Sequence, residues 1–151
     1  MPKMTRREAI VLGAGGTALA LAGWPSAALA DAKAAADEVA KFTGGKAAEA
    51  GKIAIELPEI AENGNTVPLL VTVNSPMESG NYVSDILVLA DGNPRPGVAH
   101  FQLTPMSGKA VASTRIRLAA TQNIVVVAKT STGQVFSDQK LVKVTIGGCG
   151  G

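Results

Sequence analysis

The sequence predicts an all-β domain, an antiparallel sandwich of about seven short strands with a short helix before it. Apolar and polar residues alternate in residues 67–73, 110–118 and 140–146, which is the two-residue period of half-buried strands. Two continuous apolar runs, "DILVLA" at 85–90 and "NIVVVA" at 123–128, are typical of strands buried on both sides. Turn-forming segments such as "NSPMESGN" and "DGNPRPG" separate these stretches at regular intervals.

Three of the predicted strands have one apolar face each. The residues expected on these apolar faces are Val67, Leu69, Val71 and Val73, then Ala112, Thr114, Ile116 and Leu118, and finally Val142, Val144 and Ile146. The residues expected on the opposite faces of the second and third of these strands are Ser113, Arg115 and Arg117, and Lys143 and Thr145. About 120 residues can bury a core of this kind without disulfide bonds.

Before these strands, the alanine-rich stretch "DAKAAADEVAKFTGG" predicts a short amphipathic helix over residues 32–43. Its apolar stripe is formed by Ala32, Ala35, Val39 and Phe42, and the paired glycines at 44–45 are expected to end it. A first strand is predicted near residues 53–57. Helix and strands together make one domain, residues 31–146.

Residues 1–30 have the layout of a cleaved signal peptide. A charged start leads into the apolar run "IVLGAGGTALALAGW", and the small residues Ala28 and Ala30 predict cleavage before Asp31. The pair Arg6 and Arg7 resembles a bacterial twin-arginine signal, although the residues at 9–10, Ala and Ile, are smaller than usual for that signal. An uncleaved anchor and a general secretory signal are the alternatives. We expect the mature chain in the periplasm.

Removing the signal changes the charge balance. It takes away Lys3, Arg6, Arg7 and Glu8, so the 14 basic and 12 acidic residues of the whole chain become 11 of each. A net charge near zero gives no general electrostatic reason to bind nucleic acid, which requires a concentrated basic face. No second apolar stretch is long enough to span a membrane, so no membrane association is expected after cleavage.

Conventional catalytic motifs are weak. His100 is the only histidine, and in "VAHFQL" it alternates with apolar neighbours, which predicts a surface position. A single histidine excludes a histidine-built metal site, and a Cys–His pair requires Cys149 to fold back onto it. The chain has no "GxSxG" motif of a serine hydrolase. The acidic series Glu56, Glu59 and Glu62 is interpreted as a solvated face, and we expect no metal and no catalytic residue in this chain.

The C-terminal segment is the strongest candidate site. Cys149 is the only cysteine, and it is flanked by Gly147, Gly148, Gly150 and Gly151. Glycines leave this arm, residues 147–151, with wide conformational freedom, and three extended residues reach about 10 Å beyond Ile146. The arrangement is typical of a carrier that presents a thiol-bound group to other proteins. A frayed end with an incidental cysteine is the alternative.

The ending "KVTIGGCGG", together with the signal and the stretch "LTPMSGKAVASTRIRL", resembles the Y subunit of the bacterial sulfur-oxidation (Sox) system. The resemblance covers the whole mature chain. It implies an immunoglobulin-like sandwich, a heterodimer with the Z subunit, and covalent attachment of substrate to Cys149. It also implies that this chain binds no cofactor and catalyses no reaction.

The same resemblance implies the order of the partners. A c-type cytochrome complex joins thiosulfate to Cys149 in an oxidative step, and a dimanganese hydrolase then releases sulfate. In some organisms a sulfur dehydrogenase oxidises the sulfur that remains. Haem and manganese belong to these partners.

Two further hypotheses remain open. The chain could be a periplasmic redox or assembly module that uses Cys149 for an intermolecular disulfide, or an enzyme with a pocket in the sandwich. Sulfur adducts on Cys149 distinguish the carrier from the first, and the effect of replacing Cys149 with serine distinguishes it from the second.

Overall fold

The computed structural model describes residues 26–146. The predicted export residues Arg6 and Arg7, and the predicted arm with Cys149, Gly147, Gly148, Gly150 and Gly151, lie outside the described residues. The elements in chain order are α2 (Ser26–Thr43), β1 (Ile53–Glu56), β2 (Ile60–Ala61), β3 (Val67–Val73), β4 (Met77–Glu78), β5 (Asn81–Ala90), β6 (Gly97–Gln102), the short 3-10 helix η1 (Pro105–Ser107), β7 (Val111–Ile116), β8 (Gln122–Thr130) and β9 (Val135–Val144).

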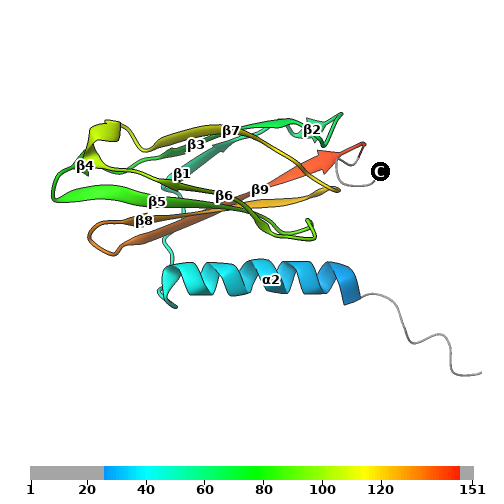
Figure 1. Cartoon of the computed structure of the whole chain (residues 1–151), viewed down its shortest axis with the longest axis horizontal. Coiled ribbons are helices and arrows are strands. Elements are labelled where there is room, and N and C mark those ends of the chain that lie inside the picture. Colours follow the sequence, from blue (N-terminus) through cyan, green and yellow to red (C-terminus); the bar gives the residue numbers. More distant parts are fainter. Residues whose placement is uncertain (1–25, 147–151) are drawn as a thin grey trace, which may run out of the picture.

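The strands form two facing sheets, with α2 on the outer side of the larger one (Figure 1). The smaller sheet has the order β1-β3-β7, and the larger has the order β2-β9-β8-β5-β4, with β6 also paired to β5. The predicted immunoglobulin-like sandwich is confirmed. The pairing is antiparallel except between β2 and β9, which run parallel. Seven strands have four or more residues, as predicted, and the very short β2 and β4 were not predicted.

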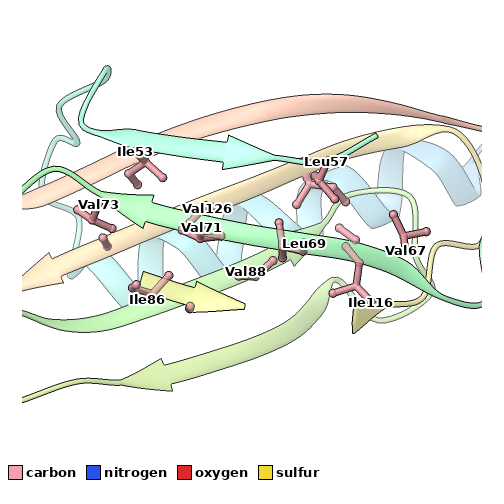
Figure 2. Close-up of a cluster of buried hydrophobic side chains, with 14 of the residues drawn as sticks. Ile53, Leu57, Val67, Leu69, Val71, Val73, Ile86, Val88, Ile116 and Val126 are labelled. Atoms are coloured by element: carbon pink, nitrogen blue, oxygen red, sulfur yellow. The ribbon is translucent and has the colours of Figure 1, made fainter. Parts of the chain in front are cut away.

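The core lies between the two sheets and follows the predicted alternation. In β3, the side chains of Val67, Leu69, Val71 and Val73 are at most 3% exposed. Figure 2 shows them turned toward Ile86 and Val88 of the opposite sheet, among other residues. Burial of apolar side chains in such an interior is the main favourable contribution to folding.

The two apolar runs become the central strands β5 and β8, and both faces of these strands are covered. Val88 and Val126 belong to the core between the sheets. Leu89 and Val127 are equally buried but alternate to the opposite face, where α2 lies (Figure 1). The prediction of two-sided burial is therefore confirmed, and α2 provides the second cover.

The helix begins earlier than predicted. It starts at Ser26 rather than at residue 32, and it ends at Thr43 as predicted. The small residues that suit a signal peptidase site are also good helix formers, so the alanine-rich sequence extends the helix toward its N-terminus. Ala35 is buried and Phe42 half-buried, but Ala32 is exposed and does not belong to the buried stripe.

The alternation expected at the end of the last strand is also wrong for one residue. β9 ends at Val144, and Ile146 is 67% exposed rather than buried. The chain leaves the strand at Thr145, so the two-residue period no longer applies there.

Candidate functional site

The candidate site is built where the sandwich ends and the predicted arm begins. Thr145 donates its amide to the carbonyl oxygen of Ala61 at 3.1 Å, and Gly64 donates its amide to the carbonyl oxygen of Ile146 at 2.9 Å. These bonds connect residues 145–146 to β2 and to the segment that follows it. We call Thr145 and Ile146 the arm root. Cys149 follows three residues later, outside the described part of the chain.

A second loop, which connects β7 to β8, lies beside the arm root. Leu118 donates its amide to the carbonyl oxygen of Gly64 at 2.8 Å, and the Thr121 hydroxyl accepts the amide of Val144 at 3.0 Å. Two main-chain hydrogen bonds therefore connect Ile146 to Leu118 by way of Gly64. Main-chain bonds hold the arm root itself, and the Thr121 hydroxyl holds Val144, the residue before it.

A buried polar network fixes this β7–β8 loop. Asn93 is 8% exposed and Gln122 is 4% exposed. The Asn93 amide donates to the carbonyl oxygen of Arg117 at 2.8 Å, and its side-chain oxygen accepts the amide of Ala119 at 2.9 Å. Gln122 donates to the same Asn93 oxygen at 2.9 Å. Buried amides that are satisfied in this way hold a loop in a single conformation.

The turn that follows β5 contributes its backbone to the same network. The Gln122 side-chain oxygen accepts the amide of Gly92 at 2.8 Å, and its side-chain nitrogen also donates to the carbonyl oxygen of Ala120 at 3.0 Å. A Cβ placed on Gly92 would lie 2.9 Å from the Gln122 Cβ, so a glycine is needed at this approach. The sequence analysis did not identify this network, although "DGN" and "TQN" are polar segments that follow or precede buried strands.

His100 is a surface residue, as predicted. Its side chain is 45% exposed, and its Nε2 atom lies 3.0 Å from Oδ1 of Asp85. Its ring meets the ring of Phe42 on α2 edge to face, with centroids 5.7 Å apart. His100 therefore belongs to the surface of the sheet on which α2 packs. The sequence analysis did not predict this contact with the helix.

The described residues contain no group of three or more His, Cys, Asp or Glu side chains placed to hold a metal ion. Glu56, Glu59 and Glu62 are all exposed, which confirms that this acidic series is a solvated face. Within residues 26–146, no helix combines the length and apolarity that crossing a membrane requires.

A groove with a volume of about 600 Å³ lies against the smaller sheet. Its polar lining comes from Glu56, Ser113 and Lys140, and the Lys140 ammonium donates to the carbonyl oxygen of Leu57 at 3.0 Å. His100 does not line it.

The chain is similar to known proteins in both sequence and fold. Residues 39–149 match the family described as "Sulfur oxidation protein SoxY". The solved structure of the sulfur carrier protein SoxY from Chlorobium limicola f thiosulfatophilum is 34% identical, with 76% of this chain and 99% of that chain covered and a TM-score of 0.63. No curated protein sequence gives a match to this chain.

More distant structures share the fold alone. A superoxide reductase (neelaredoxin) from Ignicoccus hospitalis is 16% identical, with 62% of this chain and 80% of that chain covered and a TM-score of 0.56. A putative superoxide reductase from Thermotoga maritima is 18% identical, with 64% and 93% covered and a TM-score of 0.55.

Proposed function

The chain belongs to the sulfur oxidation protein SoxY family, and on that basis we propose that it is a periplasmic carrier that holds sulfur intermediates covalently on Cys149. Members of this family are sulfur carriers rather than enzymes, and the chain has a carrier role in sulfur oxidation. One observation carries the finer proposal. The family match ends at residue 149, which is the only cysteine of the chain.

In the first proposed step, the Cys149 thiolate is joined to the outer sulfur of thiosulfate. A new S–S bond forms, the product is a Cys–S–S–SO₃⁻ group, and two electrons are released. The proposed acceptors are haem groups of a c-type cytochrome complex, and each haem iron takes up one electron at a time. The thiolate is the reactive form of cysteine, and the partner's active site supplies whatever activation the thiol needs.

In the second proposed step, water breaks the bond between the sulfonate and the sulfur that remains. Sulfate and two protons are released, and a Cys–S–S⁻ group stays on the carrier. A dimanganese hydrolase is the proposed catalyst of this step. Where a sulfur dehydrogenase is present, it oxidises the remaining sulfur. Each intermediate stays attached to Cys149, so the carrier needs no cofactor of its own.

The geometry of the arm root supports this division of labour. The main-chain bonds of Ile146 and Thr145 hold the start of the arm to the sandwich. Beyond it, three extended residues reach about 10 Å, which is far enough for the thiol to leave the domain surface. A proposed heterodimer with the Z subunit, itself a β-sandwich, completes the carrier.

Mass spectrometry of intact protein tests the proposal. Wild-type protein purified after exposure to thiosulfate and the other pathway proteins is expected to carry mass additions of thiosulfate or sulfur on Cys149, removable by a thiol reductant. A Cys149→Ser variant is expected to fold normally and to carry none. A stable disulfide to one protein, with no sulfur adduct under any condition, would instead establish the redox-module hypothesis.

Periplasmic location requires its own measurement. Cell fractionation is expected to place the wild-type protein in the periplasm, with an N-terminus at Asp31. Replacing both Arg6 and Arg7 with lysine is expected to leave the precursor in the cytoplasm. Normal export of that double variant would establish the general secretory route.

Co-purification of a small β-sandwich partner tests the proposed heterodimer.

A further inference from the structure

We propose that Arg95, Arg115 and Arg117 form a docking surface for partner proteins that present carboxylates around their active sites. We call these three residues the arginine surface, and all of them are exposed. The inference rests on the proposed function, because that function requires other proteins to act on this carrier. It adds the part of the sandwich that such proteins contact and the chemistry that they present to it.

The arginines are placed unevenly in the domain. They are the only arginines of residues 26–146, and all three lie at the end of the sandwich where β9 ends. Arg115 and Arg117 lie at the end of β7, and Arg95 lies in the loop from β5 to β6. The lysines of the same residues are spread over the helix, the strands and both ends of the sandwich, at positions 33, 41, 46, 52, 109, 129, 140 and 143. Arginine is enriched in protein interfaces and lysine is depleted there.

A hydrogen bond between two loops brings the arginines together. The side-chain nitrogen of Asn93 donates to the carbonyl oxygen of Arg117 at 2.8 Å. Arg95 follows Asn93 by two residues, which span at most about 7 Å, and Arg115 precedes Arg117 by the same number. A standard interface covers about 800 Å² of each partner. The three guanidinium groups can therefore contact one partner surface together.

The arginine side chains are available to an external anion. Ile116 is 3% exposed and Leu118 is fully buried, so the alternating chain directs Arg115 and Arg117 away from the core. Among residues 26–146, no carboxylate forms a salt bridge with any of the three guanidinium groups. A guanidinium binds a carboxylate through two parallel hydrogen bonds, which gives such a contact both strength and a fixed geometry.

The backbone beneath the arginine surface is held firmly. Asn93 is 8% exposed and Gln122 is 4% exposed. The side-chain oxygen of Asn93 accepts bonds from the amide of Ala119 and from Gln122, each at 2.9 Å. Because these buried amides fix both loops, the Arg117 backbone keeps one position while its side chain samples rotamers. A cation on a fixed support loses less conformational freedom on binding than one on a loose loop.

The location suits proteins that act on Cys149. Leu118 is bonded to Gly64, and Gly64 is bonded to Ile146, so the β7–β8 loop lies beside the point where the chain leaves the sandwich. Cys149 follows Ile146 by three residues, which span at most about 10 Å in any conformation. An enzyme that reacts with Cys149 must therefore approach this end of the sandwich, whichever way the intervening residues run.

Two carboxylates lie at the same end. Asp91 accepts bonds from the main-chain and side-chain nitrogens of Asn123, both at 2.9 Å, so its carboxylate is directed at β8. Glu62 is exposed in the segment between β2 and β3. Its charge should oppose an acidic partner, and its removal should therefore strengthen docking.

Surface plasmon resonance tests the assignment. The probes are the purified c-type cytochrome complex and the purified dimanganese hydrolase of the same bacterium, and every carrier variant also has Cys149→Ser, so that no disulfide or sulfur adduct contributes. Replacing all three arginines with glutamine is expected to raise the Kd for at least one probe about tenfold at low salt, since one exposed ion pair is worth up to about fivefold. The loss should be mainly in the association rate and should disappear at high salt.

Matched variants make the result specific. Lys109→Gln removes an exposed cation at the opposite end of the sandwich, just before β7, and is expected to change either Kd less than twofold. Replacing the three arginines with lysine should preserve the salt dependence but accelerate dissociation, because an ammonium lacks the planar fork of the guanidinium. Glu62→Gln should lower the Kd. Urea midpoints should match that of the parent protein, because all the replaced side chains are exposed.

Three outcomes would overturn the assignment. One is an unchanged Kd for both probes after replacement of the three arginines with glutamine, and another is the absence of binding by the parent protein. The third is an equal effect of Lys109→Gln, which would indicate net charge rather than a defined surface. Because the Cys149→Ser background carries no sulfur, none of these outcomes depends on adduct formation. They are therefore distinguishable from a failure of the proposed function, which the mass of the wild-type protein tests.

Discussion

The ring of Phe42 meets the ring of His100 at an interplanar angle of 89°, with 5.7 Å between the ring centroids. The ammonium of Lys129 lies 5.0 Å from the centre of the same Phe42 ring. Asp85, bonded to His100, pairs with Lys129 across the strands, so it lies between these two groups. Helix α2 is therefore held at its C-terminal end by one aromatic side chain on a polar part of the sheet.

Replacing Phe42 with alanine is expected to loosen the helix more than the domain. An edge-to-face pair and a half-exposed cation–π contact each contribute about 0.5–1.5 kcal/mol, so we expect a loss of roughly 1–3 kcal/mol when the lost burial is included. Hydrogen exchange should accelerate most in the amides of α2. The control Lys41→Ala, exposed on the same helix, should leave the exchange of α2 nearly unchanged.

Replacing Leu69 with alanine tests the core between the sheets. Leu69 is 2% exposed, and removal of a buried leucine side chain typically costs about 2–5 kcal/mol. Urea unfolding should show a midpoint shifted strongly downward with an unchanged slope. Met106→Ala removes a side chain of similar size that is 97% exposed, and its midpoint should stay close to that of the wild type. Similar losses in the two variants would contradict the described core.

A substitution at Gly92 tests the buried polar network of Asn93 and Gln122, and the same substitution at Gly80 is its control. In Gly92→Ala, the new Cβ meets the Cβ of Gln122 at 2.9 Å, which forces the buried amide away from its partners. We expect a loss of about 1–3 kcal/mol, the cost of leaving buried polar groups unsatisfied. At Gly80 the same change meets nothing within 4 Å, so its unfolding free energy should differ little from that of the wild type.

Asp37 should titrate below an ordinary aspartate. The bond donated by the Lys33 ammonium at 2.8 Å, helped by the charge of Lys33, lowers the pKa of Asp37 from its usual 3.8. A lowered pKa means that the pair stabilises the folded state above pH 3.8, and that this contribution is lost as the pH falls through the lowered value. Carboxyl NMR titration should show the lowered pKa of Asp37, and Lys33→Gln should remove most of the shift, since the charge of Lys41 makes only the smallest contribution. Because both side chains are exposed, stability at neutral pH should barely change.

The half-buried strand β3 could be predicted because apolar residues recur at every second position along it. Val67 to Val73 read as one buried face in the sequence and are one buried face in the structure. The runs in β5 and β8 predicted cover on both faces, but nothing in them indicated that α2 provides the outer cover. That relation depends on contacts between residues more than forty positions apart, such as Phe42 and His100.

Local sequence is less informative where the same residues suit two different structures. The small residues after Ser26 suit both a predicted signal peptidase site and a helix, and the structure begins α2 earlier than the sequence predicts. Arg117 looked like one of three polar residues on an outer strand face. The bonds through Gly64 and the Thr121 hydroxyl bring its loop to the end of β9, and contacts between segments so far apart in the chain cannot be deduced from alternation.

The bond between Gly64 and Ile146 has a practical consequence for protein engineering. Ile146 is the last described residue, and its carbonyl oxygen is secured by the sandwich. Sequences grafted after it would start from a defined point and direction, whatever chemistry they carry. The domain could therefore serve as a constant folded support. The length of the grafted segment and its reactive group would be varied after Ile146.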